Sequence, residues 1–232
     1  CCCHPRIITL RVICVSADSF IAFVERFPEH LSEARKLGSD VGAKGVDKVV
    51  ITGMGGSAIA GSLLQAYCTE KAPGLHVHVS RSYDVPAFVD KTTLFFAISY
   101  SGNTEETLSA VKAAMRKGAR IVALTSGGKL MRQAEQLNKP LVAVPEGIQP
   151  RAAMPYLFMP LLNVMHNSGL IPDPSAEIAA SISSLKSAAA AYKERARSLA
   201  EKLVGKVPLI YSSDRMAGVA YRWKTQFNEN SK

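Results

Sequence analysis

The stretch KVVITGMGGSAIAG, residues 48–61, joins a short apolar run to a helix through a turn that is rich in glycine. Val49–Ile51 has the character of a buried strand, and Ala58–Tyr67 has that of a helix. Glycines let a ligand approach the backbone, and the free amides at the start of a helix point toward it. This stretch therefore predicts a strand–turn–helix unit with an anion-binding turn at Gly53–Ser57.

The same order of apolar strand, polar loop and helix recurs up to residue 167. Further strands are predicted at 75–79, 94–98, 121–124 and 141–144, and helices at 105–117, 129–137 and 151–167. Strands that are apolar on both faces and alternate with helices indicate a parallel sheet that is covered on both sides. We therefore expect an α/β fold of three αβα layers, doubly wound around a five-stranded parallel sheet. Right-handed crossovers place the loops that follow the strands along one edge of such a sheet.

Helical segments flank this core on either side. Apolar residues recur at helical spacing from Phe20 to Leu37, and Pro28 is expected to kink or divide that helix. A long helix is predicted at 178–203, then a strand at Val207–Tyr211 and a helix at Met216–Asn228 whose apolar stripe we expect to be buried. This last unit begins a second α/β domain without closing a sheet, so we expect the chain to be part of a longer protein. The predicted divisions are an N-terminal segment with a packing helix at 1–44, a first domain at 45–168, and a linker helix with an incomplete second domain at 169–232.

A second loop, SYSGNT at residues 99–104, follows the predicted strand 94–98. Ser99, Ser101 and Thr104 surround a glycine, and Thr104 stands where it can cap the next helix. Hydroxyls, turn amides and a helix N-terminus together make a cradle for a phosphate dianion, and such a cradle needs no metal. The alternative is an ordinary Ser/Thr-capped turn, but two such loops on one edge of a sheet favour phosphate. A third loop on this edge, Thr125–Gly128, could line the sugar, although a plain turn is its simpler role.

The first loop also satisfies the dinucleotide-binding pattern G-x-G-x-x-A from Gly53 to Ala58. That pattern requires a carboxylate about 20 positions further on, at the end of the second strand. The second strand ends in Val79-Ser80-Arg81, without a carboxylate, and no Walker lysine follows the glycines. NADP binding remains an alternative because Arg81 could meet a 2′-phosphate, and a titration of NADPH fluorescence tests it.

Two residues outside the loops have side chains suited to catalysis on a bound sugar. Arg151 opens the predicted helix 151–167, from where its guanidinium can hold developing negative charge with a fixed fork of donors. Its alternative role is a surface ion pair with Glu146, which the sequence alone favours. Glu229 lies at the end of the C-terminal helix, where an exposed carboxylate without a catalytic role is the simpler interpretation.

Charge and cysteine patterns argue against several other classes of function. The net charge is +9, but the basic residues are scattered and never interleave with aromatics, so we expect no nucleic acid and a preference for small anions. Cys1-Cys2-Cys3 and His4 have no second pair at zinc spacing, so no metal is expected, and their origin is left open. The remaining thiols indicate a reducing compartment, and the apolar run Ile7–Val15 is too short to span a membrane. We therefore expect a cytoplasmic protein without a membrane segment.

These segments together resemble one family, the bifunctional phosphoglucose/phosphomannose isomerases of the sugar isomerase (SIS) fold. The matching motifs, in the family's order, are GMGGSAIAG at 53–61, SYSGNTEET at 99–107, PRAA at 150–153 and WKTQFNEN at 223–230. The resemblance runs from about Val46 to the end of the chain, and it implies one SIS domain followed by the start of a second.

The resemblance implies an aldose–ketose isomerase that interconverts glucose 6-phosphate and mannose 6-phosphate with fructose 6-phosphate, as a homodimer and without a cofactor. Which aldose is preferred is left open. Arg151 would stabilise the enediolate, and Glu229 would move the proton between C1 and C2. The groups implied for substrate phosphate are the amides of Gly55 and Gly56 and the hydroxyls of Ser57, Ser99, Ser101 and Thr104.

Departures from the family pattern bear on catalysis. The family's ring-opening histidine follows the glutamate motif, and a further lysine lies near its C-terminus; neither has a counterpart before Lys232, so the activity of this piece alone is left open. Ser62 stands where many members have an acid, a change that we expect to be minor. None of the five histidines is expected to replace the ring-opening group. The rival interpretation is a SIS module that binds or senses a sugar phosphate without turnover, for which Arg151 and Glu229 would be dispensable.

Overall fold

A parallel sheet of five strands forms the centre of the computed structural model, which describes residues 17–231. Cys1–Cys3, His4 and Cys14 lie outside the described residues. The strand order is β2-β1-β3-β4-β5, and every neighbouring pair is parallel. The strands are β1 (Lys48–Thr52), β2 (His76–Ser80), β3 (Thr93–Ile98), β4 (Arg120–Thr125) and β5 (Leu141–Ala143). These five strand predictions are confirmed, each to within one residue at either end.

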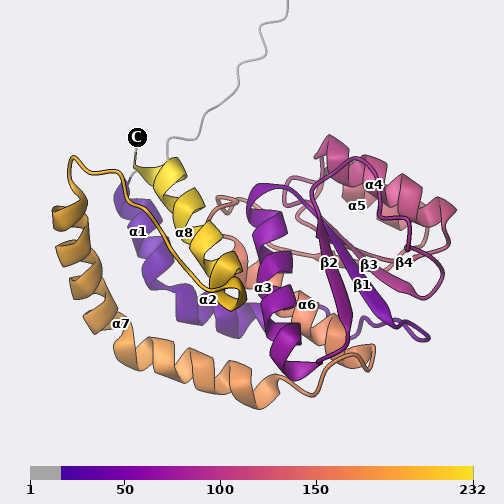
Figure 1. Cartoon of the computed structure of the whole chain (residues 1–232), viewed down its shortest axis with the longest axis horizontal. Coiled ribbons are helices and arrows are strands. Elements are labelled where there is room, and N and C mark those ends of the chain that lie inside the picture. Colours follow the sequence, from indigo (N-terminus) through magenta and orange to yellow (C-terminus); the bar gives the residue numbers. More distant parts are fainter. Residues whose placement is uncertain (1–16, 232) are drawn as a thin grey trace, which may run out of the picture.

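Helices cover both faces of the sheet (Figure 1). On one face lie α3 and α6, with α2 and α7 outside them, and on the other lie α4 and α5. The expected three-layer α/β fold is therefore confirmed. The helices are α1 (Ala17–Glu25), α2 (Phe27–Ala34), α3 (Gly55–Lys71), α4 (Glu105–Arg116), α5 (Gly128–Gln136), α6 (Met154–Asn167), α7 (Ser175–Leu203) and α8 (Ala217–Asn230), with a 3-10 turn at Asp214–Met216 before α8.

Alternating side chains of the central strands supply the two halves of the core. Val49 and Ile51 of β1 point into the cluster that contains α3 and α6, whereas Val50 between them packs against α4 and α5. In β3, Phe96 and Phe95 divide in the same way, and none of these five side chains is more than 1% exposed. The period of two residues in a strand explains why a continuous apolar run is needed where both faces are covered.

The N-terminal helices pack on the core that contains α3 and α6, as predicted. Pro28 lies in the first turn of α2, where its missing N–H has no helical partner to lose, so the chain divides into α1 and α2 at this point. The buried ring of His30 lies 2.9 Å from the hydroxyl of Tyr156 on α6, and that hydroxyl donates to Glu33 at 2.5 Å. The hydrogen bond from Tyr156 is the main reason that the pKa of Glu33 is lowered. These bonds join α2 to α6.

The C-terminal region differs from its predicted structure in two respects. Val207–Tyr211 forms no strand, and its apolar side chains are exposed, Val207 by 87% and Leu209 by 75%. A strand requires a hydrogen-bonded neighbour, and none of residues 17–231 pairs with this segment. The apolar stripe of α8 is not buried either, because Trp223 is 47% exposed and no layer of the described chain covers it.

α6 begins at Met154 and not at Arg151, which lies in the turn before it. The prolines at 155 and 160 are accommodated in α6, as predicted.

α7 is the longest helix of residues 17–231, with 29 residues. Among the helices of residues 17–231, none is both long and apolar enough to cross a membrane. The predicted domain boundaries remain a prediction.

Candidate functional site

The two hydroxyl-rich loops leave adjacent strands at the point where the strand order reverses. From β1 the chain crosses to β2 on one side, and from β3 it continues through β4 to β5 on the other. In doubly wound sheets, ligands bind in the crevice beyond the carboxyl ends of the two strands at such a switch point. The loop after β1 and the loop after β3 leave the sheet at this point, and a Cβ on Gly53 would lie only 3.0 Å from the carbonyl oxygen of Ile98.

Two further segments close on these loops. A Cβ on Gly56 would lie 3.3 Å from the carbonyl oxygen of Pro150, so the turn that carries Arg151 rests on the first loop. Gly102, with φ of +67°, comes so close to Gly127 that any side chain at 102 would collide with the backbone there. The loops after β1, β3 and β4 and the turn before α6 therefore meet at one edge of the sheet.

The hydroxyls predicted to bind phosphate lie on these two loops and differ in burial. Ser57, in the first turn of α3, is 8% exposed, and Ser99 is 1% exposed. The Ser99 and Thr104 hydroxyl oxygens lie 2.8 Å apart, while Ser101 is exposed and its hydroxyl accepts from the N–H of Asn103 at 3.3 Å.

Thr104 is the N-cap residue of α4, as predicted, but its hydroxyl makes no hydrogen bond to the helix. Because the hydroxyl pairs with Ser99 instead, the first amides of α4 have no side-chain cap. Met54, the N-cap residue of α3, likewise supplies no cap hydrogen bond. Two helix starts with uncapped amides are suited to hold an anion.

The third loop uses its hydroxyls within the turn. Thr125 Oγ1 donates to the carbonyl of Gly127 at 2.9 Å, and Ser126 Oγ donates to the carbonyl of Tyr100 at 2.6 Å. The simpler of its two predicted roles, a turn that supports the second loop, fits this geometry.

Tyr100 connects the second loop to the segment that leads to Arg151. Its hydroxyl donates to the carbonyl of Pro145 at 2.8 Å and accepts from the N–H of Ile148 at 2.8 Å. Burial raises the pKa of this hydroxyl, which remains a donor at neutral pH. Sequence reasoning missed this residue, because nothing in the sequence says that its partners lie 45 and 48 positions further on.

Arg151 meets the C-terminal helix and not Glu146. Its Nε donates to Oδ1 of Asn230 at 2.8 Å, and its guanidinium carbon lies 4.6 Å from the centre of the Phe20 ring. The alternative of an ion pair with Glu146 does not occur in the described part of the chain. The carbonyl of Arg151 accepts from Arg222 at 2.7 Å and from Gln226 at 3.3 Å.

Glu229 precedes Asn230 at the end of α8 and is exposed, as the simpler interpretation expected. It stands seven positions after Arg222, which is about two helical turns, so both lie on one face of α8. Burial lowers the pKa of the Arg222 guanidinium, and the negative charge of Glu229 acts against that shift. The face of α8 that contacts Arg151 thus also carries Glu229.

Arg81, the residue on which the NADP alternative depends, is engaged in structural contacts. Its guanidinium donates to Oγ of Ser62 at 3.1 Å and lies 5.5 Å from the centre of the Tyr221 ring. Ser62 therefore accepts a hydrogen bond from an arginine. The histidines of β2, His76 and His78, pack edge-on against Phe88. Among residues 17–231, no three His, Cys, Asp or Glu side chains are grouped to hold a metal ion.

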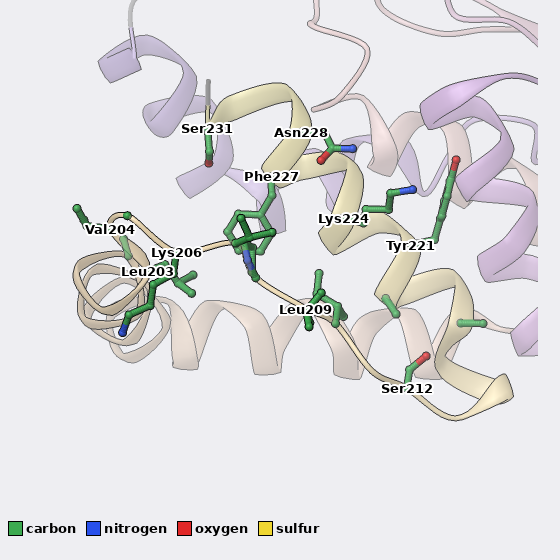
Figure 2. Close-up of a pocket in the computed structure, with 17 residues that line it drawn as sticks. Leu203, Val204, Lys206, Leu209, Ser212, Tyr221, Lys224, Phe227, Asn228 and Ser231 are labelled. Carbon is green, nitrogen blue, oxygen red and sulfur yellow. The ribbon is translucent and has the colours of Figure 1, made fainter.

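A hollow lies away from these loops, between α8 and the extended segment before it (Figure 2). It has a volume of about 960 Å³ and is lined mostly by apolar side chains such as Leu203, Leu209 and Phe227. Only Lys206 and Lys224 bring charge to its lining. Since no residue of the hydroxyl-rich loops lines this hollow, the loops at the switch point are the better candidate for a sugar-phosphate site.

Comparison with known proteins agrees with this geometry. Residues 44–150 match the SIS domain model, and residues 192–232 match the model of the bacterial phospho-glucose isomerase C-terminal SIS domain. The bifunctional phosphoglucose/phosphomannose isomerase of Caldicellulosiruptor bescii is 43% identical over 221 residues, which cover 90% of this chain and 65% of that protein. The D-glucosamine-6-phosphate 4-epimerase of Sulfolobus acidocaldarius is 34% identical, with the same two coverages.

Among solved structures, the C-terminal domain of glucosamine-fructose-6-phosphate aminotransferase from Francisella tularensis matches 93% of this chain and 69% of its own, with a TM-score of 0.65 and 16% identity. That likeness shows the fold alone. The chain spans 65% of the length of these two relatives and 56–57% of the length of three other bifunctional phosphoglucose/phosphomannose isomerases, which is less than two thirds. Two domain models match this chain, and one relative is 43% identical to it over nine tenths of its residues. The chain therefore belongs to the SIS-domain family of bifunctional phosphoglucose/phosphomannose isomerases.

Proposed function

We propose that this protein is an aldose–ketose isomerase that interconverts glucose 6-phosphate and mannose 6-phosphate with fructose 6-phosphate. The observation that carries the proposal is the convergence of four segments at the switch point, where the hydroxyl-rich loops meet the Arg151 turn and Arg151 meets the face of α8 with Glu229. The names of several relatives, including the one from Caldicellulosiruptor bescii, support the same activity.

In this proposal the phosphate is the anchor of the substrate. The start of α3 supplies amides and the hydroxyl of Ser57, and the second loop supplies the remaining hydroxyls. Both helix starts direct partial positive charge at the dianion. This charge stabilises a bound phosphate monoester more than it stabilises a neutral sugar. The proposed groups are the amides of Gly55 and Gly56 and the hydroxyls of Ser57, Ser99, Ser101 and Thr104.

The chemistry requires one base and one cationic group beside the anchored sugar. In the open-chain aldose, Glu229 would remove the proton from C2 while the C1 carbonyl oxygen gains negative charge, which gives the enediolate. Arg151 would stabilise that charge, because a carboxylate is too weak a base for this proton unless the developing oxyanion is stabilised. Return of the proton to C1, with transfer of the hydroxyl proton from O2 to O1, gives the ketose and restores the Glu229 carboxylate.

The decisive experiment compares turnover with binding in the full-length protein. Glu229→Gln should lower kcat for fructose 6-phosphate by more than about 100-fold, because it removes the base. The Kd measured by calorimetry should not change. Ser99→Ala should instead weaken binding by about 10- to 100-fold, the worth of one hydrogen bond to a charged group. Glu201→Gln on α7, an exposed carboxylate, is the matched control and should change neither.

Undiminished turnover in Glu229→Gln would refute the assigned base. A wild-type protein that binds fructose 6-phosphate without isomerising it would establish the rival function, a SIS module that binds or senses sugar phosphates. Glucosamine 6-phosphate belongs among the tested substrates, because one relative is named an epimerase of that sugar.

We also propose that the protein acts as a homodimer in the cytoplasm. The family resemblance supports the first, and the free, buried thiol of Cys68 fits a reducing compartment. Light scattering of the purified full-length protein would measure the oligomeric state, and a single-subunit mass would exclude the dimer.

A further inference from the structure

Three residues of α8 contact Arg151, and they are spaced so that one face of the helix presents all of them. Arg222, Gln226 and Asn230 follow one another at intervals of four residues, and each interval turns the helix by only about 40°. Arg222 and Gln226 donate to the main-chain carbonyl of Arg151, while Asn230 accepts from its guanidinium Nε. A single helix face therefore holds both the backbone and the side chain of Arg151.

The backbone part of this contact replaces a hydrogen bond that the start of α6 lacks. The carbonyl of Arg151 precedes α6, where the residue four positions later would normally donate an N–H to it. That residue is Pro155, which has no N–H. Arg222 at 2.7 Å and Gln226 at 3.3 Å provide the donors that the proline cannot, so α8 completes the turn that carries Arg151.

The side-chain part forms a short relay. The amide nitrogen of Asn230 donates to the carbonyl of Gln226 at 2.9 Å and to its side-chain oxygen at 3.3 Å, which orients the Asn230 oxygen toward Arg151. On its other side, the guanidinium stacks over the ring of Phe20. Only Nε is used, since the two terminal nitrogens have no hydrogen-bond partner among residues 17–231. The guanidinium is thus fixed at its base, and its outer donors are left for a ligand.

We propose that Arg222, Gln226 and Asn230 of α8 are positioning residues that set the place and orientation of Arg151 for the enediolate. The inference rests on the proposed isomerase function and extends it, since these residues act on the reaction only through Arg151. Because Glu229 lies on the same helix face, α8 carries both the proposed base and the residues that hold the Arg151 turn.

The test is a double-mutant cycle with kcat and KM for fructose 6-phosphate measured separately in the full-length protein. Asn230→Ala should lower kcat by about 10- to 100-fold, the usual penalty for a misplaced catalytic group, with KM unchanged because the phosphate cradle is intact. In an Arg151→Ala background the same substitution should have no further effect. Asn230→Asp, which keeps an acceptor for Nε, should restore most of kcat. Asn228→Ala, a change of the same size on the side of α8 that lines the hollow in Figure 2, is the control and should leave kcat unaltered.

Each outcome is decisive. Equal losses of kcat from Asn230→Ala in both backgrounds would show a merely structural role and overturn the proposal. Full kcat in Asn230→Ala, with Arg151→Ala impaired, would refute the positioning role and leave the isomerase assignment intact. Full kcat in Arg151→Ala would refute both the role assigned to Arg151 and the positioning of it. Should Asn230→Ala fold poorly by circular dichroism, Gln226→Leu is the second variant, and it carries the same expectations.

Discussion

The hydroxyl of Tyr100 lies 2.8 Å from the backbone nitrogen of Ile148, and it donates at the same distance to the carbonyl of Pro145. One side chain of the second hydroxyl-rich loop thus holds the segment that leads to Arg151 at two points, Pro145 and Ile148. The bonds replace secondary structure there, since residues 144–153 belong to no helix or strand. This phenol is therefore one of the contacts that set the distance between the proposed phosphate cradle and Arg151.

Tyr100→Phe should lower the free energy of unfolding by about 1–3 kcal/mol, because the half-buried N–H of Ile148 loses its partner. Urea denaturation measures this. Tyr192→Phe is the matched control, since the Tyr192 side chain is 51% exposed and the same atom is removed. The kcat of Tyr100→Phe should also fall, as the Arg151 segment loosens. Identical midpoints for the two variants would show that the phenol does not hold this segment.

Gly218→Val should push α8 away from α3. A Cβ at 218 would lie 3.2 Å from the backbone carbonyl of Ser62, which cannot move without distorting α3. We expect a loss of about 1–3 kcal/mol, the usual cost of overpacking, and a change in the fluorescence of Trp223, the single tryptophan of the chain. Ala220→Val on the same helix faces the open hollow and is the control. Equal effects of the two substitutions would refute the close contact.

Asp90 should contribute stability that disappears in acid. Its carboxylate accepts from the hydroxyl and the N–H of Thr92 and from Lys48, and these bonds, those from Thr92 above all, lower its pKa from 3.8 to about 2. Because the folded pKa lies below the ordinary one, the contribution is complete above about pH 4 and is lost as the pH falls toward 2.

Thermal unfolding of wild type and Asp90→Asn at a series of pH values checks this. The gap in Tm between the two proteins should be widest near neutral pH and should close between about pH 4 and pH 2. Asp40→Asn, which removes an exposed carboxylate without a hydrogen bond to the described residues, should show no such closing gap. A gap that is constant down to pH 2 would mean that the carboxylate charge has no part in it.

The sequence by itself determined the sheet and the two hydroxyl-rich loops, and the reason is that both are local. Val49–Ile51 and Leu94–Ile98 are apolar at every position, which only strands covered on both faces require, and the glycines and hydroxyls follow each strand directly. Parallel connections then leave no choice about the edge on which the loops lie. The family motifs at 150–153 and 223–230 added Arg151 and Glu229, which spacing alone could not assign.

Only the tertiary structure decided what holds Arg151 and what becomes of the C-terminal region. The hydrogen-bond partners of Arg151 come from α8, 71 to 79 positions away. The sequence pattern does not indicate which surfaces meet at that separation. A polar helix face follows from the spacing of Arg222, Gln226 and Asn230, but only the tertiary structure shows that Arg151 contacts this face. Val207–Tyr211 has the composition of a strand but pairs with none of residues 17–231, because a strand needs a neighbour and the composition of one segment does not supply it.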